Sequence, residues 1–203
     1  GWGLACKKNG RGQIVVCCLG DGGANRGTAH ECLLMCSIWK LPVLFLVENN
    51  GLSIHSPVED MMPTPNITDW AQGYNIPGVV VDGQDVVAVA EAAQTAIEHA
   101  RIGKGPCMIE AKTVRLAGHT SGFPDVIRYT PRTKEQIDKL RERDAIQICQ
   151  KRLLEEGILT QTLIDEIEEA AVREIEEAER FADESPVGDQ MDLNNLDALI
   201  YAR

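Results

Sequence analysis

The sequence has few aromatic residues, no long apolar run and no excess of basic residues. Aromatic side chains make up 4% of the 203 residues and hydrophobic residues 44%, so a core can form mainly from aliphatic side chains. No stretch approaches the roughly 18 apolar residues of a membrane span, and we therefore expect no membrane association. A net charge of -11 offers no basic surface for nucleic acid, which we exclude as a partner.

The acidic excess is confined to one late segment. Residues 1–154 carry 17 Lys/Arg and 16 Asp/Glu, whereas residues 155–184 carry 2 and 12. The sequence therefore predicts a nearly neutral body followed by an acidic appendage, and such a segment would repel phosphates.

The seven cysteines include no Cys-x-x-Cys pair, and their odd number argues against a disulfide framework. Cys17 and Cys18 are adjacent inside an apolar run. We expect buried, free thiols in a reducing compartment, and hence a cytoplasmic location. The chain begins Gly-Trp-Gly without an initiator methionine, which leaves open a removed N-terminal segment.

Short apolar runs bounded by Gly or Pro predict the strands of a parallel sheet. The first run, residues 13–19, is continuous, which is typical of a strand covered on both faces. Helical spacings of three and four separate the runs, and Asp85 is a predicted N-cap. This alternation predicts an α/β fold, with an open, mostly parallel sheet and flanking helices. The four predicted strands are residues 13–19, 43–47, 78–81 and 107–114.

A helical segment is predicted after the sheet. Residues 116–132 lack periodicity and predict a long loop. Thr133 and Gln136 have the spacing of a capping box at the start of a helix, and two helices are expected, split near Gly157. We therefore predict an α/β domain over residues 1–132 and a helical C-terminal extension over residues 133–203.

Glycines and polar side chains follow the first two predicted strands, where ligands bind in open parallel sheets. Residues 20–25 read Gly-Asp-Gly-Gly-Ala-Asn, and glycines of this kind let a phosphate approach the backbone. Asp21 has the wrong charge for a phosphate loop, but a divalent cation removes the conflict. Asp21, the amide oxygen of Asn50 and the carbonyl of Leu52 could supply oxygen ligands to magnesium.

Each of these segments alone is more often a simple turn, and the prediction of a site depends on their combination. A nicotinamide-binding loop is an alternative from another class of fold. It is disfavoured because residues 20–25 lack the third glycine and because Asp21 would face the pyrophosphate without a cation.

Gly20-Asp21-Gly22 followed by Asn49-Asn50 is similar to the thiamine-diphosphate motif. Segments 25–28, 39–42 and 48–51 resemble the alpha subunits of 2-oxo acid and acetoin dehydrogenases, and the likeness runs from Leu4 to about Thr133. The resemblance implies the thiamine-diphosphate-binding fold, with thiamine diphosphate and Mg²⁺ as cofactors.

The resemblance also implies roles for individual residues. His119, within the active-site loop of residues 115–121, would line the cavity, contact the cofactor and act in catalysis. Arg128-Tyr129 matches the Tyr-Arg pair of that loop in reversed order. Thr120 and Ser121 occupy a stretch that is phosphorylated in some relatives. The implied magnesium ligands are Asp21, Asn50 and the Leu52 carbonyl, and the implied cofactor-binding residues are Gly20, Asp21, Gly22, Gly23, Ala24, Asn25, Asn50, Leu52 and His119.

The function implied by the resemblance is oxidative decarboxylation of a 2-oxo acid such as pyruvate, with transfer of the acyl group to lipoyl on an acyltransferase. The implied partners are a beta subunit, in an assembly of two alpha and two beta chains, and the lipoyl-bearing acyltransferase. Two alternatives remain: the alpha subunit of an acetoin dehydrogenase, and a non-catalytic assembly half that needs a beta chain and a missing N-terminal part. The sequence does not choose among pyruvate, branched-chain 2-oxo acids and acetoin.

Overall fold

A computed structural model of the chain describes residues 1–120 and 125–186. The chain divides into two compact units, Gly1–Lys151 and Arg152–Arg203. The predicted boundary after residue 132 falls inside the first unit.

Within the described residues, no helix combines the length and the hydropathy needed to cross a bilayer. In chain order the elements are α1 (Trp2–Asn9), β1 (Val15–Gly20), α2 (Asp21–Ala24), α3 (Gly27–Ile38), β2 (Val43–Asn49), β3 (Leu52–Ser53), β4 (Ser56–Pro57), the 3-10 helix η1 (Val58–Asp60), α4 (Thr68–Gly73), β5 (Gly78–Asp82), α5 (Val86–Arg101), β6 (Cys107–Lys112), β7 (Val126–Ile127), β8 (Thr130–Pro131), α6 (Lys134–Arg141), α7 (Ala145–Glu155) and α8 (Gln161–Glu184).

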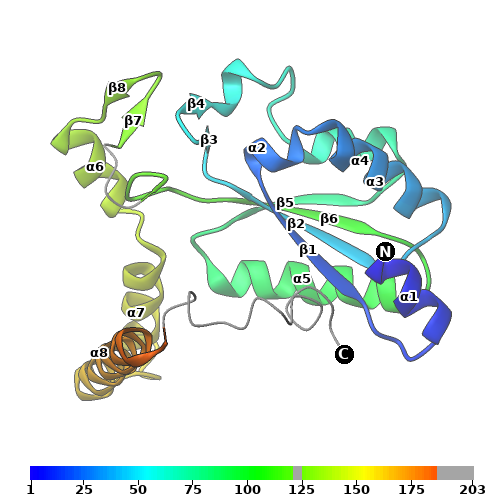
Figure 1. Cartoon of the computed structure of the whole chain (residues 1–203). Helices are drawn as coiled ribbons and strands as arrows, with labels where there is room; N and C mark the ends of the chain where they lie inside the picture. Colours follow the sequence, from blue (N-terminus) through cyan, green and yellow to red (C-terminus); the bar gives the residue numbers. More distant parts are fainter. Residues whose placement is uncertain (121–124, 187–203) are drawn as a thin grey trace. The chain divides into compact units, whose positions relative to one another are not determined.

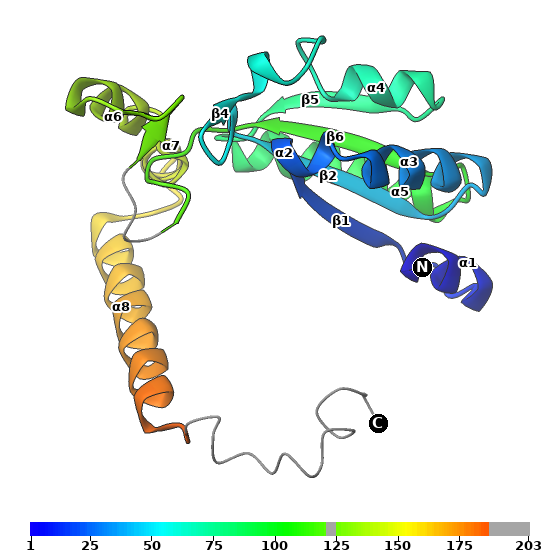
Figure 2. The same ribbon diagram turned by 45° about the horizontal axis from the view of Figure 1, so that its top comes forward.

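A four-stranded parallel sheet forms the centre of the first unit, which confirms the predicted α/β fold. Its strand order is β1-β2-β6-β5, and every pairing is parallel. Helix α5 lies on one face of the sheet, and α3 and α4 lie on the other (Figures 1 and 2). The carboxyl ends of the strands all point toward α2 and the β3–β4 hairpin (Figure 1).

The core has two halves because β2 alternates its side chains between the two faces. Val43, Phe45 and Val47 pack with residues of α3 and α4, whereas Leu44 packs with Ala96 of α5. The apolar run that predicted this strand is continuous because both of its faces are covered.

The prediction that the first strand is covered on both faces is wrong. Strand β1 lies at the edge of the sheet, and its residues alternate between partly buried and exposed, with Val16 47% exposed. Its Cys17 and Leu19 pack against the core on the α3 side. Helix α5 packs on the other face mainly against β2, β5 and β6, and Val16 and Cys18 of β1 remain exposed on that face.

The cysteine prediction is correct in one part and wrong in another. All seven thiols are free. Cys36 and Cys107 are buried as expected, but Cys18 and Cys32 are exposed. Cys18 is exposed because β1 is an edge strand and only one of its faces is packed.

The predicted helix caps are present. Asp85 accepts hydrogen bonds from the backbone N–H groups of Val87 and Ala88, and Thr133 forms the predicted capping box with Gln136. Gly157, with φ 69°, follows α7, where a split was expected.

Over residues 133–186 the structure has three helices where two were predicted. The first of the two expected helices is interrupted after α6, because the carboxylate of Asp144 accepts a hydrogen bond of 2.9 Å from the N–H of Ile146 and starts α7. The expected loop 116–132 contains the short β7–β8 hairpin. The pattern also did not predict α1, α4 or the β3–β4 hairpin.

Candidate functional site

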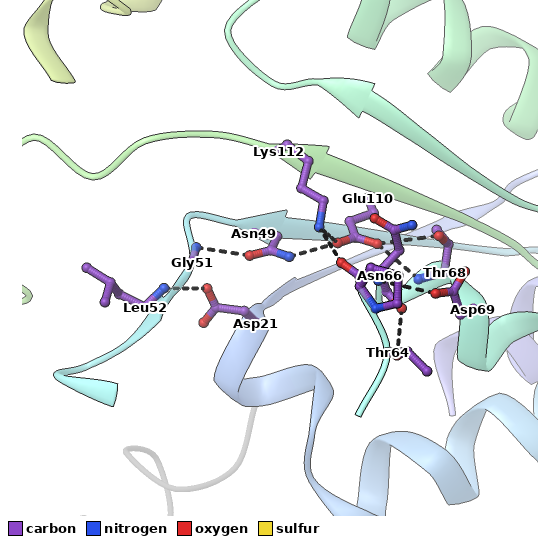
Figure 3. Close-up of polar contacts among 11 residues, drawn as sticks. Asp21, Asn49, Gly51, Leu52, Thr64, Asn66, Thr68, Asp69, Glu110 and Lys112 are labelled. Atoms are coloured by element: carbon purple, nitrogen blue, oxygen red, sulfur yellow. Dashed lines mark hydrogen bonds and ion pairs between the residues drawn. The ribbon is translucent and has the colours of Figure 1, made fainter. Parts of the chain in front are cut away.

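The strand ends bring Asp21 and the loop after β2 together. Strand β1 pairs in parallel with β2, and Gly20 lies opposite Glu48. Asp21 therefore begins α2 beside the segment that follows β2. Asp21 is 3% exposed, and its carboxylate accepts a hydrogen bond of 2.7 Å from Gly22 N. It accepts a second hydrogen bond, of 3.1 Å, from Leu52 N (Figure 3).

Asn50 converges on the same point. Its Oδ1 atom accepts a hydrogen bond of 3.1 Å from Leu52 N, so one N–H group is shared by the Asp21 carboxylate and the Asn50 amide oxygen. The two side chains come from the ends of adjacent strands, as the sequence predicted. Two side-chain oxygen atoms from adjacent strand ends therefore accept from the same N–H group.

A cavity of about 610 Å³ opens at this point. Seven of the residues that the sequence assigned to the cofactor line it, and Ala24 and Asn25 have other contacts. Ala24 is 3% exposed and belongs to the core, while Asn25 donates a hydrogen bond of 3.2 Å to the carbonyl of Met61. The predicted residues that line the cavity are Gly20, Asp21, Gly22, Gly23, Asn50, Leu52 and His119.

The glycines of this segment serve two different purposes. A Cβ atom on Gly20 or Gly23 would meet no atom within 4 Å, so the cavity comes up to the bare backbone at these two positions. A Cβ atom on Gly22 would instead collide with the side chain of Ser53, because the two Cβ atoms would be only 2.7 Å apart. Gly22 is therefore required for the close packing of α2 against β3, while Gly20 and Gly23 leave room for a ligand.

The donor set fits magnesium bound together with phosphate. Asp21 offers a carboxylate and Asn50 an amide oxygen, and Mg²⁺ bound with phosphates usually takes one or two carboxylates and fills its other positions with oxygen atoms of phosphate and water. Over residues 1–120 and 125–186, no group of three or more His, Cys, Asp or Glu side chains could hold a metal ion.

The cavity also contains residues that the sequence did not assign to it. Arg26 and Thr28 follow the glycine segment, and Cys17 and Cys32 contribute thiols. Burial raises the pKa of the Cys17 thiol, and the neighbouring thiols of Cys18 and Cys32 raise it further. Arg26 and Thr28 could have been found from their position at the start of a helix that follows a phosphate loop.

Ile54, a further lining residue, has an unusual backbone conformation. Its φ of 56° lies in the left-handed region, which a β-branched residue rarely adopts. The side chain is 50% exposed. Arg115 holds this conformation through a hydrogen bond of 2.8 Å from Nη1 to the carbonyl of Ile54. Such strain is common at ligand sites.

Ion pairs hold together the segment that carries His119, and Arg115 connects this segment to the carbonyl of Ile54, between β3 and β4. His119 is exposed and lines the cavity. Arg115 and Arg132 both form ion pairs with Asp125. Ser121, the last residue of the predicted active-site loop, lies outside the described residues, and Thr120 is exposed.

Arg128 has a clear structural role. Its guanidinium pairs with Glu59 and Asp60 at 2.8 and 2.7 Å. The hydrogen bond from Arg128 lowers the pKa of Asp60. The neighbouring Tyr129 is 88% exposed and has a φ of 65°. Arg128 thus joins the β7–β8 hairpin to η1.

The family model described as "Dehydrogenase E1 component" matches residues 1–190 of the chain. The chain is 41% identical over 187 residues to the alpha subunit of acetoin:2,6-dichlorophenolindophenol oxidoreductase from Bacillus subtilis, which covers 92% of this chain and 54% of that protein. It is 36% identical over 196 residues to the pyruvate dehydrogenase E1 component subunit alpha of Porphyra purpurea, and this match covers 97% of the chain and 55% of that protein. It is 35% identical over 187 residues to the somatic, mitochondrial form of the same subunit from Homo sapiens, and this match covers 92% of the chain and 47% of that protein. The chain spans about half the length of the curated relatives it matches.

Proposed function

Because the chain belongs to the dehydrogenase E1 component family, we propose that it forms the cofactor-binding part of the alpha subunit of a thiamine-diphosphate-dependent 2-oxo acid dehydrogenase. The observation that carries the proposal is the convergence of the Asp21 carboxylate and the Asn50 amide oxygen on Leu52 N, at 3.1 Å each, in a cavity lined by open glycines. The names of the relatives above support it.

In this proposal, the chain's own residues hold the charged end of the cofactor. Asp21 and Asn50 bind Mg²⁺ together with the Leu52 carbonyl, and the backbone at Gly20 and Gly23 approaches the diphosphate. Arg26 adds a positive charge to the same cavity. When bound, thiamine diphosphate supplies a thiazolium carbanion that can attack a 2-oxo acid and hold the electrons released with carbon dioxide. His119 contacts the reacting groups from the loop above the cavity.

The proposed partners are a beta subunit and a lipoyl-bearing acyltransferase that accepts the acyl group. Acetoin is a second candidate substrate, because the relative with 41% identity is named for acetoin oxidation while the two pyruvate dehydrogenase relatives are 36% and 35% identical. Decarboxylation or cleavage assays with pyruvate, branched-chain 2-oxo acids and acetoin, on the chain co-expressed with a beta subunit, distinguish these substrates.

The decisive experiment is a calorimetric titration of thiamine diphosphate, with and without Mg²⁺, into this assembly and its Asp21→Asn variant. We expect the variant to lose at least about tenfold in affinity in the presence of Mg²⁺, because a carboxylate ligand becomes a neutral amide. Asp82→Asn is the matched control. Asp82 also ends a parallel strand, but it is exposed and pairs with Arg143 at 3.0 Å. Equal affinities for wild type and Asp21→Asn, or no binding by wild type, would overturn the proposal.

A further inference from the structure

A carboxylate lies fully buried in the sheet, close to the proposed metal loop. Glu110 of β6 is 0% exposed. It accepts hydrogen bonds from Asn49 Nδ2 at 2.7 Å and from Thr68 N at 3.0 Å, and Lys112 Nζ lies 2.6 Å from it (Figure 3). Burial acts to raise the pKa of Glu110, but these hydrogen bonds and the charge of Lys112 outweigh it and hold the pKa below its ordinary value. Glu110 is therefore an ionised group that only accepts hydrogen bonds.

Asn49 connects this carboxylate to the loop that follows β2. The side chain of Asn49 is 4% exposed, and its two ends have different partners. Nδ2 donates to Glu110, while Oδ1 accepts a hydrogen bond of 2.9 Å from Gly51 N (Figure 3). An ionised carboxylate cannot donate, so it accepts the NH₂ end of the amide and leaves the oxygen for Gly51. Glu110 thereby sets which way the Asn49 amide points.

The loop beyond Asn49 holds the proposed ligands. Gly51 has a φ of 79°, in the left-handed region where glycine is favoured, and the next residue is Leu52. Leu52 N is the donor shared by Asp21 and Asn50. The hydrogen bond from Gly51 N to Asn49 therefore restrains the backbone immediately before the shared N–H group of Leu52.

We propose that Glu110, acting through the side-chain amide of Asn49, is a positioning residue that holds the Gly51–Leu52 backbone in the conformation in which Asp21 and Asn50 converge. The inference rests on the proposed function, in which Asp21 and Asn50 are magnesium ligands. The alternative is that the cluster only attaches α4 to the sheet, through Thr68, and has no effect on the loop.

The test measures hydrogen exchange at the amides of Gly51 and Leu52, without cofactor, in the full chain with its partner subunit. Asn49→Leu keeps the size of the side chain and removes both hydrogen bonds. We expect exchange at both amides to accelerate by about tenfold or more relative to the amide of Val47, because Gly51 N loses its acceptor, Asn49 Oδ1, and the loop loses its connection to Glu110. The affinity for thiamine diphosphate with Mg²⁺ should fall by a similar factor, and kcat at saturating cofactor should change much less.

Three further variants separate positioning from simple destabilisation. Glu110→Met should reproduce the exchange of Asn49→Leu, and the double variant should add nothing, because Glu110 acts through Asn49. Glu110→Gln should largely preserve the slow exchange, because its amide oxygen still accepts from Asn49. Ile109→Val is the matched control: this neighbour is also 0% exposed, but it packs toward α5.

The inference is overturned if Asn49→Leu leaves exchange at Gly51 and Leu52 unchanged, if Ile109→Val accelerates it equally, or if Glu110→Met and Asn49→Leu act additively. Each of these results is obtained without cofactor. Failure of the proposed function would appear separately, as a wild-type assembly that does not bind thiamine diphosphate.

Discussion

Replacing Gly22 by alanine tests how closely α2 packs against β3. The new Cβ atom would lie 2.7 Å from the Cβ atom of Ser53, closer than such atoms approach in folded proteins. Rotating the Ser53 hydroxyl away does not remove this contact, so the backbone of α2 or β3 must shift. Overpacking of this kind costs about 1–3 kcal/mol of unfolding free energy.

A second substitution should relieve the collision. In a Ser53→Gly background, the nearest remaining Ser53 atom would be Cα, 3.6 Å from the new Cβ atom, which is an ordinary van der Waals distance. We therefore expect Gly22→Ala to cost little in that background. Urea unfolding of the four proteins in the double-mutant cycle should give a coupling free energy of about 1–2 kcal/mol in favour of the pair.

Gly23→Ala is the matched control one residue away. A Cβ atom at this position meets nothing within 4 Å, so the substitution should leave stability unchanged or raise it by about 0.5 kcal/mol through the unfolded chain. It nevertheless places a methyl group in the cavity and should weaken cofactor binding. The packing argument is refuted if Gly22→Ala and Gly23→Ala have equal stability, or if Gly22→Ala costs the same with Ser53 and with Gly at that position.

Three further predictions concern the thiols, the buried carboxylate and a helix cap. Iodoacetamide should modify the exposed Cys18 and Cys32 before the buried Cys36, because burial raises the pKa of the Cys36 thiol. Bound cofactor should protect Cys32, which lines the cavity, but not Cys18. Peptide mass spectrometry measures this, and equal protection of both thiols contradicts the assignment. The ionised form of Glu110 should add stability that is lost as the pH falls below about 4.5, its ordinary pKa. The urea midpoint of the wild type should therefore fall more steeply on acidification than that of Glu110→Gln, and parallel curves disprove this. Thr133→Ala should lower the unfolding free energy by about 1 kcal/mol, and Gln136→Ala should add little to it, because both belong to one capping box.

Much of the fold could be predicted from local patterns. The apolar run of residues 43–47 identified β2 because that strand is covered on both faces in the structure. The same reasoning failed for β1, because a strand's place in the sheet depends on tertiary pairing and not on its own composition. The convergence of Asp21 and Asn50 was predictable because parallel strands end at the same edge of a sheet.

The contacts that fix the site could not be predicted in the same way. Asn49 and Glu110 are 61 residues apart, and they meet only because β2 pairs with β6 in the register that places Asn49 opposite Lys112. A one-residue slip would move Glu110 to the other face of the sheet. Likewise, the need for glycine at position 22 comes from Ser53 on another element. Sequence patterns suggested a phosphate as the reason for that glycine, and the structure provides a packing reason.

The charges in the cavity explain why metal and diphosphate should bind as a pair. Arg26 is the only Lys or Arg side chain among the described residues that line the cavity, and Asp21 contributes a buried negative charge. A diphosphate entering alone would therefore meet a carboxylate that is 3% exposed and little screened by water. A divalent cation between the carboxylate and the phosphates turns this repulsion into two attractions. Each of the two ligands should then raise the affinity for the other by the same factor, as linkage requires. The titration with and without Mg²⁺ measures that factor, and its loss in Asp21→Asn would locate the coupling at this carboxylate.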